Sequence, residues 1–122
     1  MKTAFAIAAL AIAFAGGHSH HATAQKSSVA VGVAEREWGI SSYRAHVKRG
    51  SVRFNVTNFG EDAHNLEVLG PHGYRSRVSA DIKAHEHTTL ALKLRRPGIY
   101  RLICTKPGHV RKGMRATIRV TR

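Results

Sequence analysis

Cysteine, proline and acidic residues are all scarce in this chain of 122 residues, which has one Cys, 3 Pro and 7 Asp and Glu. A single cysteine, Cys104, excludes a disulfide within the chain, so its thiol is free, bridged to another molecule or bound to a metal. The few acids form no evident pair for acid–base catalysis. The chain also has 20 Lys and Arg, which give it a net charge of +13 with histidine neutral.

Long apolar runs are scarce too, and the one candidate lies at the N-terminus. Lys2 precedes an almost wholly apolar stretch at residues 3–15, and Ala22-Thr23-Ala24 has the A-x-A form of a cleavage site. The run is shorter than the roughly 20 residues that a membrane-spanning helix needs. We predict a cleaved signal peptide at residues 1–24, a periplasmic or secreted location and no stable membrane insertion. A retained N-terminal anchor is the alternative.

The remaining segment, residues 25–122, is short enough to be a single domain. Its positive charge favours acidic proteins, anionic membrane surfaces or nucleic acid as partners. Export argues against nucleic acid, and the basic residues are spread along the chain rather than gathered in one helix or tail. We therefore expect a monomer with a broadly basic surface that binds no nucleic acid.

The pattern of apolar residues in this segment is that of β-strands. No stretch keeps a helical period, whereas several alternate between apolar and polar residues, and turn signals such as Asn58-Phe59-Gly60 and Arg96-Pro97-Gly98 separate them. Short strands at this spacing predict an all-β fold, an antiparallel sandwich or barrel. The predicted inward-facing positions are Val29, Val31, Val33, Val52, Phe54, Val56, Leu90, Leu92, Leu94, Tyr100, Leu102, Ala116, Ile118 and Val120.

Three side chains that can bind a metal lie close together near the C-terminus. Cys104 is followed by a Pro- and Gly-containing turn, then by His109 and by Met114 at equal spacing. Thiolate, imidazole and thioether are three of the donors of a blue copper centre, in which two His and one Cys bind in a plane with a weak axial Met. A second histidine has to come from elsewhere in the chain.

The strand pattern predicts that this second histidine is His64. Side chains two positions apart in a strand share a face, and His64 has the inward parity of the apolar residues in a predicted strand over residues 64–69. Cys104 and Met114 have the inward parity of their own strands. His85 and His87 have the opposite parity, so we expect them to face solvent.

Each of these residues also has an ordinary structural explanation. A lone Cys is often a small buried hydrophobe, and a lone Met often fills a gap in a core. Zinc also accepts Cys and His ligands, so another metal is an alternative to copper. The shared parity, the spacing and the single thiol of an exported chain together favour a metal site.

Several segments resemble the cupredoxins, the small blue copper proteins, and the resemblance extends over residues 29–122. Residues 47–58 are similar to the turn and strand that precede the first ligand, and residues 63–68 resemble the first ligand region. The similarity to the C-terminal ligand loop and last strand covers residues 97–109, 113–114 and 117–120. The resemblance implies a Greek-key β-sandwich that binds one copper ion and transfers single electrons.

The resemblance also implies roles for individual residues. The copper ligands would be His64, Cys104, His109 and, in the axial position, Met114. Asn65 would connect the two ligand loops, as the residue after the first ligand does in azurin-like proteins. The edge at the second histidine is the family's docking surface, and here basic residues surround it, which implies an acidic redox partner. These residues are Lys106, Arg111 and Lys112.

Two functions agree with these features. The first is a periplasmic one-electron carrier between redox partners, and the second is copper delivery or tolerance without a redox cycle. Copper-delivery sites usually expose Met- or His-rich tracts, which residues 25–122 do not have. Four ligands leave no open position for a substrate, so we expect that the protein is not an enzyme.

Overall fold

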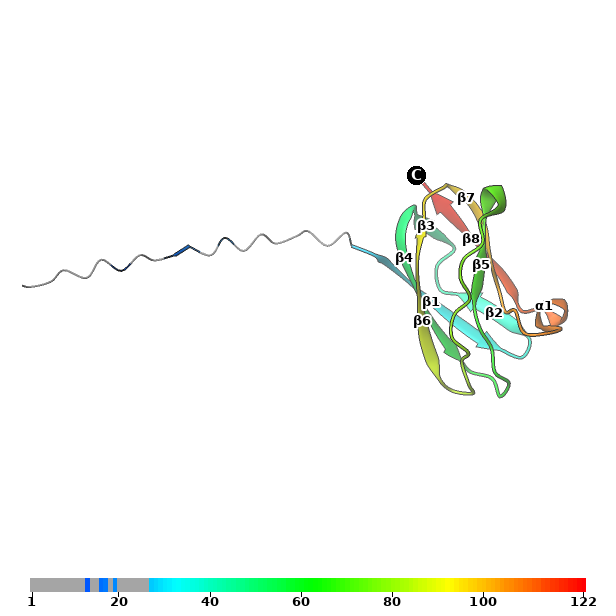
Figure 1. Cartoon of the computed structure of the whole chain (residues 1–122). Helices are drawn as coiled ribbons and strands as arrows, with labels where there is room; N and C mark the ends of the chain where they lie inside the picture. The colour runs from blue at the N-terminus through cyan, green and yellow to red at the C-terminus, as the bar shows by residue number, and fades with distance from the viewer. Residues whose placement is uncertain (1–12, 14–15, 18, 20–26) are drawn as a thin grey trace, which may run out of the picture.

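The computed structural model describes residues 13, 16–17, 19 and 27–122, so the predicted signal peptide lies almost wholly outside it. Residues 27–122 form a sandwich of two four-stranded sheets, with strand orders β2-β1-β4-β6 and β3-β8-β7-β5 (Figure 1). The elements are β1 (Val29–Arg36), β2 (Gly39–Ser42), β3 (His46–Lys48), β4 (Gly50–Asn58), β5 (Glu67–Leu69), the 3₁₀ turn η1 (Pro71–Gly73), β6 (His87–Leu94), β7 (Gly98–Ile103), α1 (His109–Lys112) and β8 (Arg115–Thr121).

The chain crosses repeatedly between the two sheets, which gives the expected all-β Greek-key sandwich. The expectation of purely antiparallel sheets was wrong, because β1 pairs with β4 and β3 pairs with β8 in parallel. Parallel neighbours need a crossover connection, and here the chain passes through strands of both sheets between each parallel pair. Among the described residues, no helix is long and apolar enough to cross a membrane.

The predicted inward-facing residues form the core between the sheets. Nearly all of them are buried, and Val29 and Ala116 pack against the core from its margin. The strand predicted over residues 64–69 is shorter than expected and begins at Glu67, although Leu66 and Val68 are fully buried as predicted. His64 instead forms an isolated bridge with Ile82. The short strands β2 and β3 were not predicted.

The order of β5, β7 and β8 explains why the candidate ligands meet. These strands are neighbours and antiparallel, so the start of β5, the end of β7 and the start of β8 lie at one end of the sheet. His64 precedes β5, Cys104 follows β7 and Met114 precedes β8. The short helix α1, which carries His109, lies beside this end, away from the C-terminus (Figure 1).

Candidate metal centre

Three of the four predicted ligands present their donor atoms to one point. The Nδ1 atom of His64 lies 3.2 Å from Nδ1 of His109, and the Cys104 Sγ atom lies 3.4 Å from Nδ1 of His109 and 4.0 Å from Nδ1 of His64. A first-row metal ion binds imidazole nitrogen at about 2.0–2.1 Å and thiolate at about 2.3 Å, which separates its ligand atoms by roughly 3–4 Å. The three atoms therefore have the spacing of ligands to a single ion.

Met114 completes the predicted set at the same place. Its side chain is fully buried, its N–H donates to the His109 carbonyl at 3.0 Å, and its carbonyl accepts from the Cys104 N–H at 3.3 Å. The backbone thus connects Met114 directly to both ligands of the C-terminal loop. Two imidazoles, one thiolate and one thioether form a type 1 copper site, because this donor set suits both Cu(I) and Cu(II).

Burial shifts the pKa values of Cys104 and His109, the two ligands of the loop, in opposite directions. The Cys104 side chain is fully buried, and this desolvation raises the pKa of its thiol. Burial also lowers the pKa of His109, and the nearby His64 ring lowers it further. The His109 imidazole is therefore neutral and ready to bind at neutral pH, whereas a metal has to displace the thiol proton.

Asn65 connects the two ligand segments. Its Oδ1 atom accepts hydrogen bonds from the Thr105 N–H at 2.7 Å and from the Thr105 hydroxyl at 3.0 Å. Asn65 is only 5% exposed, whereas Thr105 is exposed, so these bonds lie at the boundary between the core and the surface. Asn65, which follows His64, is thereby joined to Thr105, which follows Cys104. The cupredoxin resemblance implied this connection between the two ligand loops.

The sequence analysis missed two contacts that the β1–β2 hairpin makes with the histidines. The Nε2 atom of His64 lies 2.7 Å from Oε1 of Glu37. The Trp38 ring stands edge-on to His109, with centroids 4.8 Å apart. No local pattern in the sequence marks these residues, because the hairpin is distant from both ligands along the chain.

Glu37 is held as a carboxylate. The backbone N–H groups of Glu61 and Asp62 donate to it at 3.0 and 2.9 Å. These bonds, led by that of Glu61, and the bond to His64 lower the pKa of Glu37 to about 2. The carboxylate therefore accepts from His64 throughout the neutral range.

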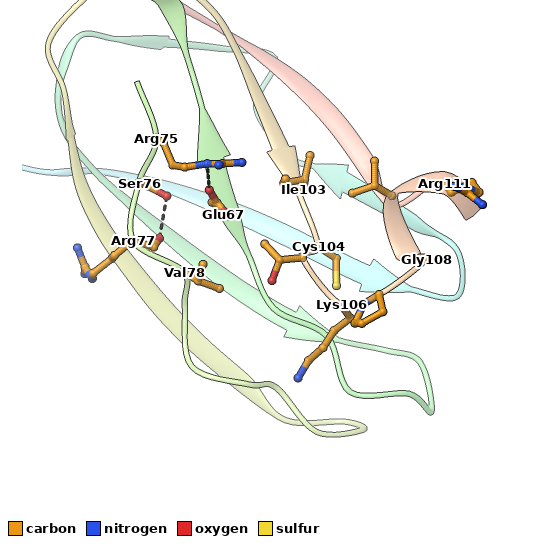
Figure 2. Close-up of a pocket in the computed structure, with 13 residues that line it drawn as sticks. Glu67, Arg75, Ser76, Arg77, Val78, Ile103, Cys104, Lys106, Gly108 and Arg111 are labelled. Atoms are coloured by element: carbon orange, nitrogen blue, oxygen red, sulfur yellow. Dashed lines mark hydrogen bonds and ion pairs between the residues drawn. The ribbon is translucent and has the colours of Figure 1, made fainter. Parts of the chain in front are cut away.

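The three basic residues near His109 differ in their surroundings. The Lys106 ammonium pairs with Asp81 at 2.6 Å, and the Lys112 ammonium lies 4.0 Å from the centroid of the Trp38 ring. The Arg111 side chain is exposed. Lys106 and Arg111 also line a groove of about 950 Å³ between the ligand loop and residues 75–78 (Figure 2).

The other described histidines lie outside the site. His46, His72, His85 and His87 are all exposed, as the strand parity predicted for the last two. The His85 Nε2 atom lies 3.3 Å from Oε1 of Glu61. Within the described part of the chain, the one cluster of His, Cys or acidic side chains able to hold a metal is His64, Cys104 and His109, whose ligand atoms lie within 4.8 Å.

Solved structures of small copper proteins have a similar fold. Reduced auracyanin from Roseiflexus castenholzii matches with a TM-score of 0.67 at 17% identity, over 79% of this chain and 99% of its own. Auracyanin A from Chloroflexus aurantiacus, a "blue" copper protein, matches with a TM-score of 0.62 at 14% identity, over 78% and 100%. Reduced rusticyanin matches with a TM-score of 0.55 at 15% identity, over 78% and 81%.

The fold is that of the cupredoxins. No family model and no curated protein matches the sequence, so the likeness lies in the fold and in the four donors rather than in overall sequence. The antiparallel order of β5, β7 and β8 brings the end of β7 and the start of β8 together. These are the positions where the chain carries its lone Cys and its only Met beyond residue 1.

Proposed function

We propose that this protein is an exported type 1 copper protein that carries single electrons between redox partners. The observation that supports this most directly is the convergence of His64 Nδ1, Cys104 Sγ and His109 Nδ1 within 4.8 Å. Met114, directly before β8, supplies the fourth donor. The donor set is complete within one small domain, so no partner chain has to contribute a ligand.

The burial of the ligands favours electron transfer over metal exchange. His64, Cys104 and Met114 are fully buried, whereas His109 is half-buried. Ligands fixed by a packed sandwich move little between Cu(II) and Cu(I), which makes a one-electron step fast. His109 provides the side of the site that faces a partner, and an electron can pass through its ring without release of the ion.

The surface around His109 suits an acidic partner. Arg111 and Lys112 are exposed there, and the groove beside Cys104 adds Arg75 and Arg77 to the positive rim (Figure 2). Arg75 is partly neutralised by Glu67, with which it forms an ion pair. A positive field of this kind steers acidic proteins toward the exposed edge and raises their association rate.

Copper delivery without a redox cycle is the competing function. A delivery protein has to release its ion to an acceptor, which requires an accessible or easily opened site. The buried Cys104 and Met114 favour the carrier, because partners cannot reach these ligands without disturbing the loop.

Addition of Cu(II) to purified residues 25–122 tests the metal assignment. We expect an intense visible absorption from the Cys104 thiolate bound to Cu(II), and no visible band with Zn(II), which has a filled d shell. Failure to bind copper, or binding without the visible band, would contradict a type 1 site.

Electron exchange with hexacyanoferrate(III), a small anionic oxidant, tests the carrier. The double variant Arg111→Glu and Lys112→Glu should slow oxidation of the Cu(I) protein about tenfold at low salt, within the range for electrostatic steering. The matched control is Arg95→Glu and Arg96→Glu, which changes the charge equally at the opposite end of β7. Equal slowing in both variants would show that only net charge matters. Rapid copper loss to a chelator with no electron exchange would favour delivery.

A further inference from the structure

The Glu37 carboxylate lies in a cradle formed by residues 60–62. Besides the N–H donors of Glu61 and Asp62, Gly60 packs directly against both carboxylate oxygens, and a Cβ atom at this position would collide with them. Only glycine fits there without displacing Glu37. The turn therefore has both the donors and the space that this one side chain requires.

Asn58, a fully buried residue at the end of β4, holds the cradle in shape. Its Oδ1 atom accepts from the Gly60 N–H at 2.8 Å, and its Nδ2 group donates to the carbonyls of Asp62 at 2.7 Å and Ile82 at 2.9 Å. Ile82 exchanges two backbone hydrogen bonds with His64, at 3.1 and 2.8 Å. A continuous network thus runs from Asn58 through the cradle to His64.

The bond between Glu37 and His64 decides which ring nitrogen carries the proton. A neutral imidazole has one N–H and one bare nitrogen, and Nδ1 of His64 has to be bare to bind a metal. A carboxylate accepts but does not donate, so the 2.7 Å contact favours the proton on Nε2. We propose that Glu37 is a positioning residue, which holds His64 in its metal-binding tautomer and orientation and places a negative charge behind the ligand.

The charge of Glu37 has a consequence beyond orientation. A carboxylate on the far nitrogen of a ligating histidine raises the basicity of the ligand. A more basic ligand and a nearby negative charge stabilise Cu(II) relative to Cu(I), so Glu37 lowers the reduction potential. This second effect rests on the proposed copper function, whereas the selection of the tautomer belongs to the metal-free protein as well.

The tautomer is measured first, in the metal-free protein, from the ¹⁵N chemical shifts of the His64 ring. We expect wild type and Glu37→Gln to keep the proton on Nε2, because the glutamine Oε1 atom also accepts. Glu37→Ala removes the acceptor and should give a mixture of tautomers. The matched control is Glu86→Ala, which removes an exposed carboxylate outside the cradle. An unchanged tautomer in Glu37→Ala would overturn the positioning role.

Copper affinity and reduction potential are measured second, by competition with a chelator and by voltammetry. Loss of a partner of a ligating histidine typically weakens metal binding about 10- to 100-fold, and we expect this for Glu37→Ala. Glu37→Gln should raise the potential, and Glu86→Ala should leave it nearly unchanged. If Glu37→Ala does not fold, Glu37→Gln decides, and an unchanged potential there would overturn the charge effect. If the tautomer changes in Glu37→Ala as expected but the wild type binds no copper, the proposed function is refuted and the positioning role remains intact.

Discussion

Glu35 and Glu37 are two residues apart in the β1–β2 hairpin, yet one carboxyl group is buried without partners and the other is hydrogen-bonded. Glu35 points from β1 into the core, where it is fully buried and neither carboxylate oxygen has a partner among the described residues. Glu37, at the hairpin, is 24% exposed and has three donors. Burial raises the pKa of Glu35 to about 8, whereas hydrogen bonds lower that of Glu37 to about 2.

The two glutamates show how the apolar core and the polar groups at the ligand-bearing end differ in what they offer a carboxylate. The interior of the sandwich is apolar and is stabilised by packing, so an acid there is unfavourable when charged. The ligand-bearing end contains buried polar groups, and Asn58, His64 and Asn65 all have hydrogen-bond partners. The candidate metal site thus lies at the end of the sandwich where hydrogen-bonding groups are available for buried polar side chains.

The first prediction is a change that should affect the metal site and leave the fold of the sandwich intact. Cys104→Ser should abolish the visible absorption of the copper protein, because the hydroxyl cannot replace the thiolate as the donor of that transition. The sandwich should remain folded, since serine is similar in size to cysteine and the strands do not depend on the metal. Visible absorption and far-ultraviolet circular dichroism measure the two effects. A retained band would refute Cys104 as a ligand.

The second prediction concerns the unpartnered acid of the interior. Because the pKa of Glu35 is raised in the folded state, its contribution is fully present below pH 4.5 and is lost as pH rises toward about 8. At about 1.36 kcal/mol per pKa unit, the loss amounts to at most about 5 kcal/mol. Urea denaturation of the metal-free protein at pH 5 and pH 8.5 measures it.

Glu35→Gln is the variant that tests this assignment. The amide is similar in shape and does not ionise, so the decline in stability between pH 5 and pH 8.5 should be much smaller than in wild type. His109 and Cys104 also titrate, and their contribution remains in both proteins. Equal declines in the two proteins would show that Glu35 is not the group responsible.

The third prediction concerns a substitution that changes only the packing of the core. Phe54 is fully buried in β4, and Phe54→Ala should lower the free energy of unfolding by about 3–5 kcal/mol. The molecules that remain folded should keep the visible spectrum of the copper protein, because Phe54 contacts no ligand through a polar group. Denaturation and absorption measure the two properties. A changed spectrum in the folded fraction would show that the interior and the ligand-bearing end are not independent.

The interior is the region that could be predicted from the sequence. Alternation alone identified the inward residues of β1, β4, β6, β7 and β8, because one face of each strand is apolar. β2 and β3 were missed because strands of three or four residues are too short to show a period. The parallel pairs could not be predicted, since local patterns contain no information on which strands become neighbours.

The ligand-bearing end could be predicted where strand parity, the spacing of the C-terminal loop or the cupredoxin resemblance marked a residue. The parity of His64, Cys104 and Met114 pointed to one place, and the structure brings their segments together. Glu37 and the cradle at residues 60–62 were missed, because the signal for them is three-dimensional. Asn58-Phe59-Gly60 was visible as a turn, but its partner across the site was not.

The last prediction concerns the smallest effect, at the connection between the ligand segments. Asn65→Ala removes the acceptor of the Thr105 N–H and hydroxyl, at a place that is only partly buried because Thr105 is exposed. A fully buried unsatisfied donor costs about 1–3 kcal/mol, so we expect a loss near the lower end of that range in the free energy of unfolding. Copper affinity should fall less than in Glu37→Ala, because the Asn65 side chain bonds to Thr105 and its backbone, which contacts the Cys104 thiol, is kept in the variant.

Thr105→Val is the matched control for Asn65→Ala. It removes the hydroxyl donor but keeps the backbone N–H bond to Asn65, so its loss of stability should be clearly smaller. If both variants lose the same amount, the backbone bond contributes little and the hydroxyl accounts for the connection. If Asn65→Ala costs nothing, the ligand-bearing end is stabilised by packing like the interior, and the contrast between the two regions fails. We expect the backbone bond to dominate, because at 2.7 Å it is shorter than the hydroxyl bond at 3.0 Å.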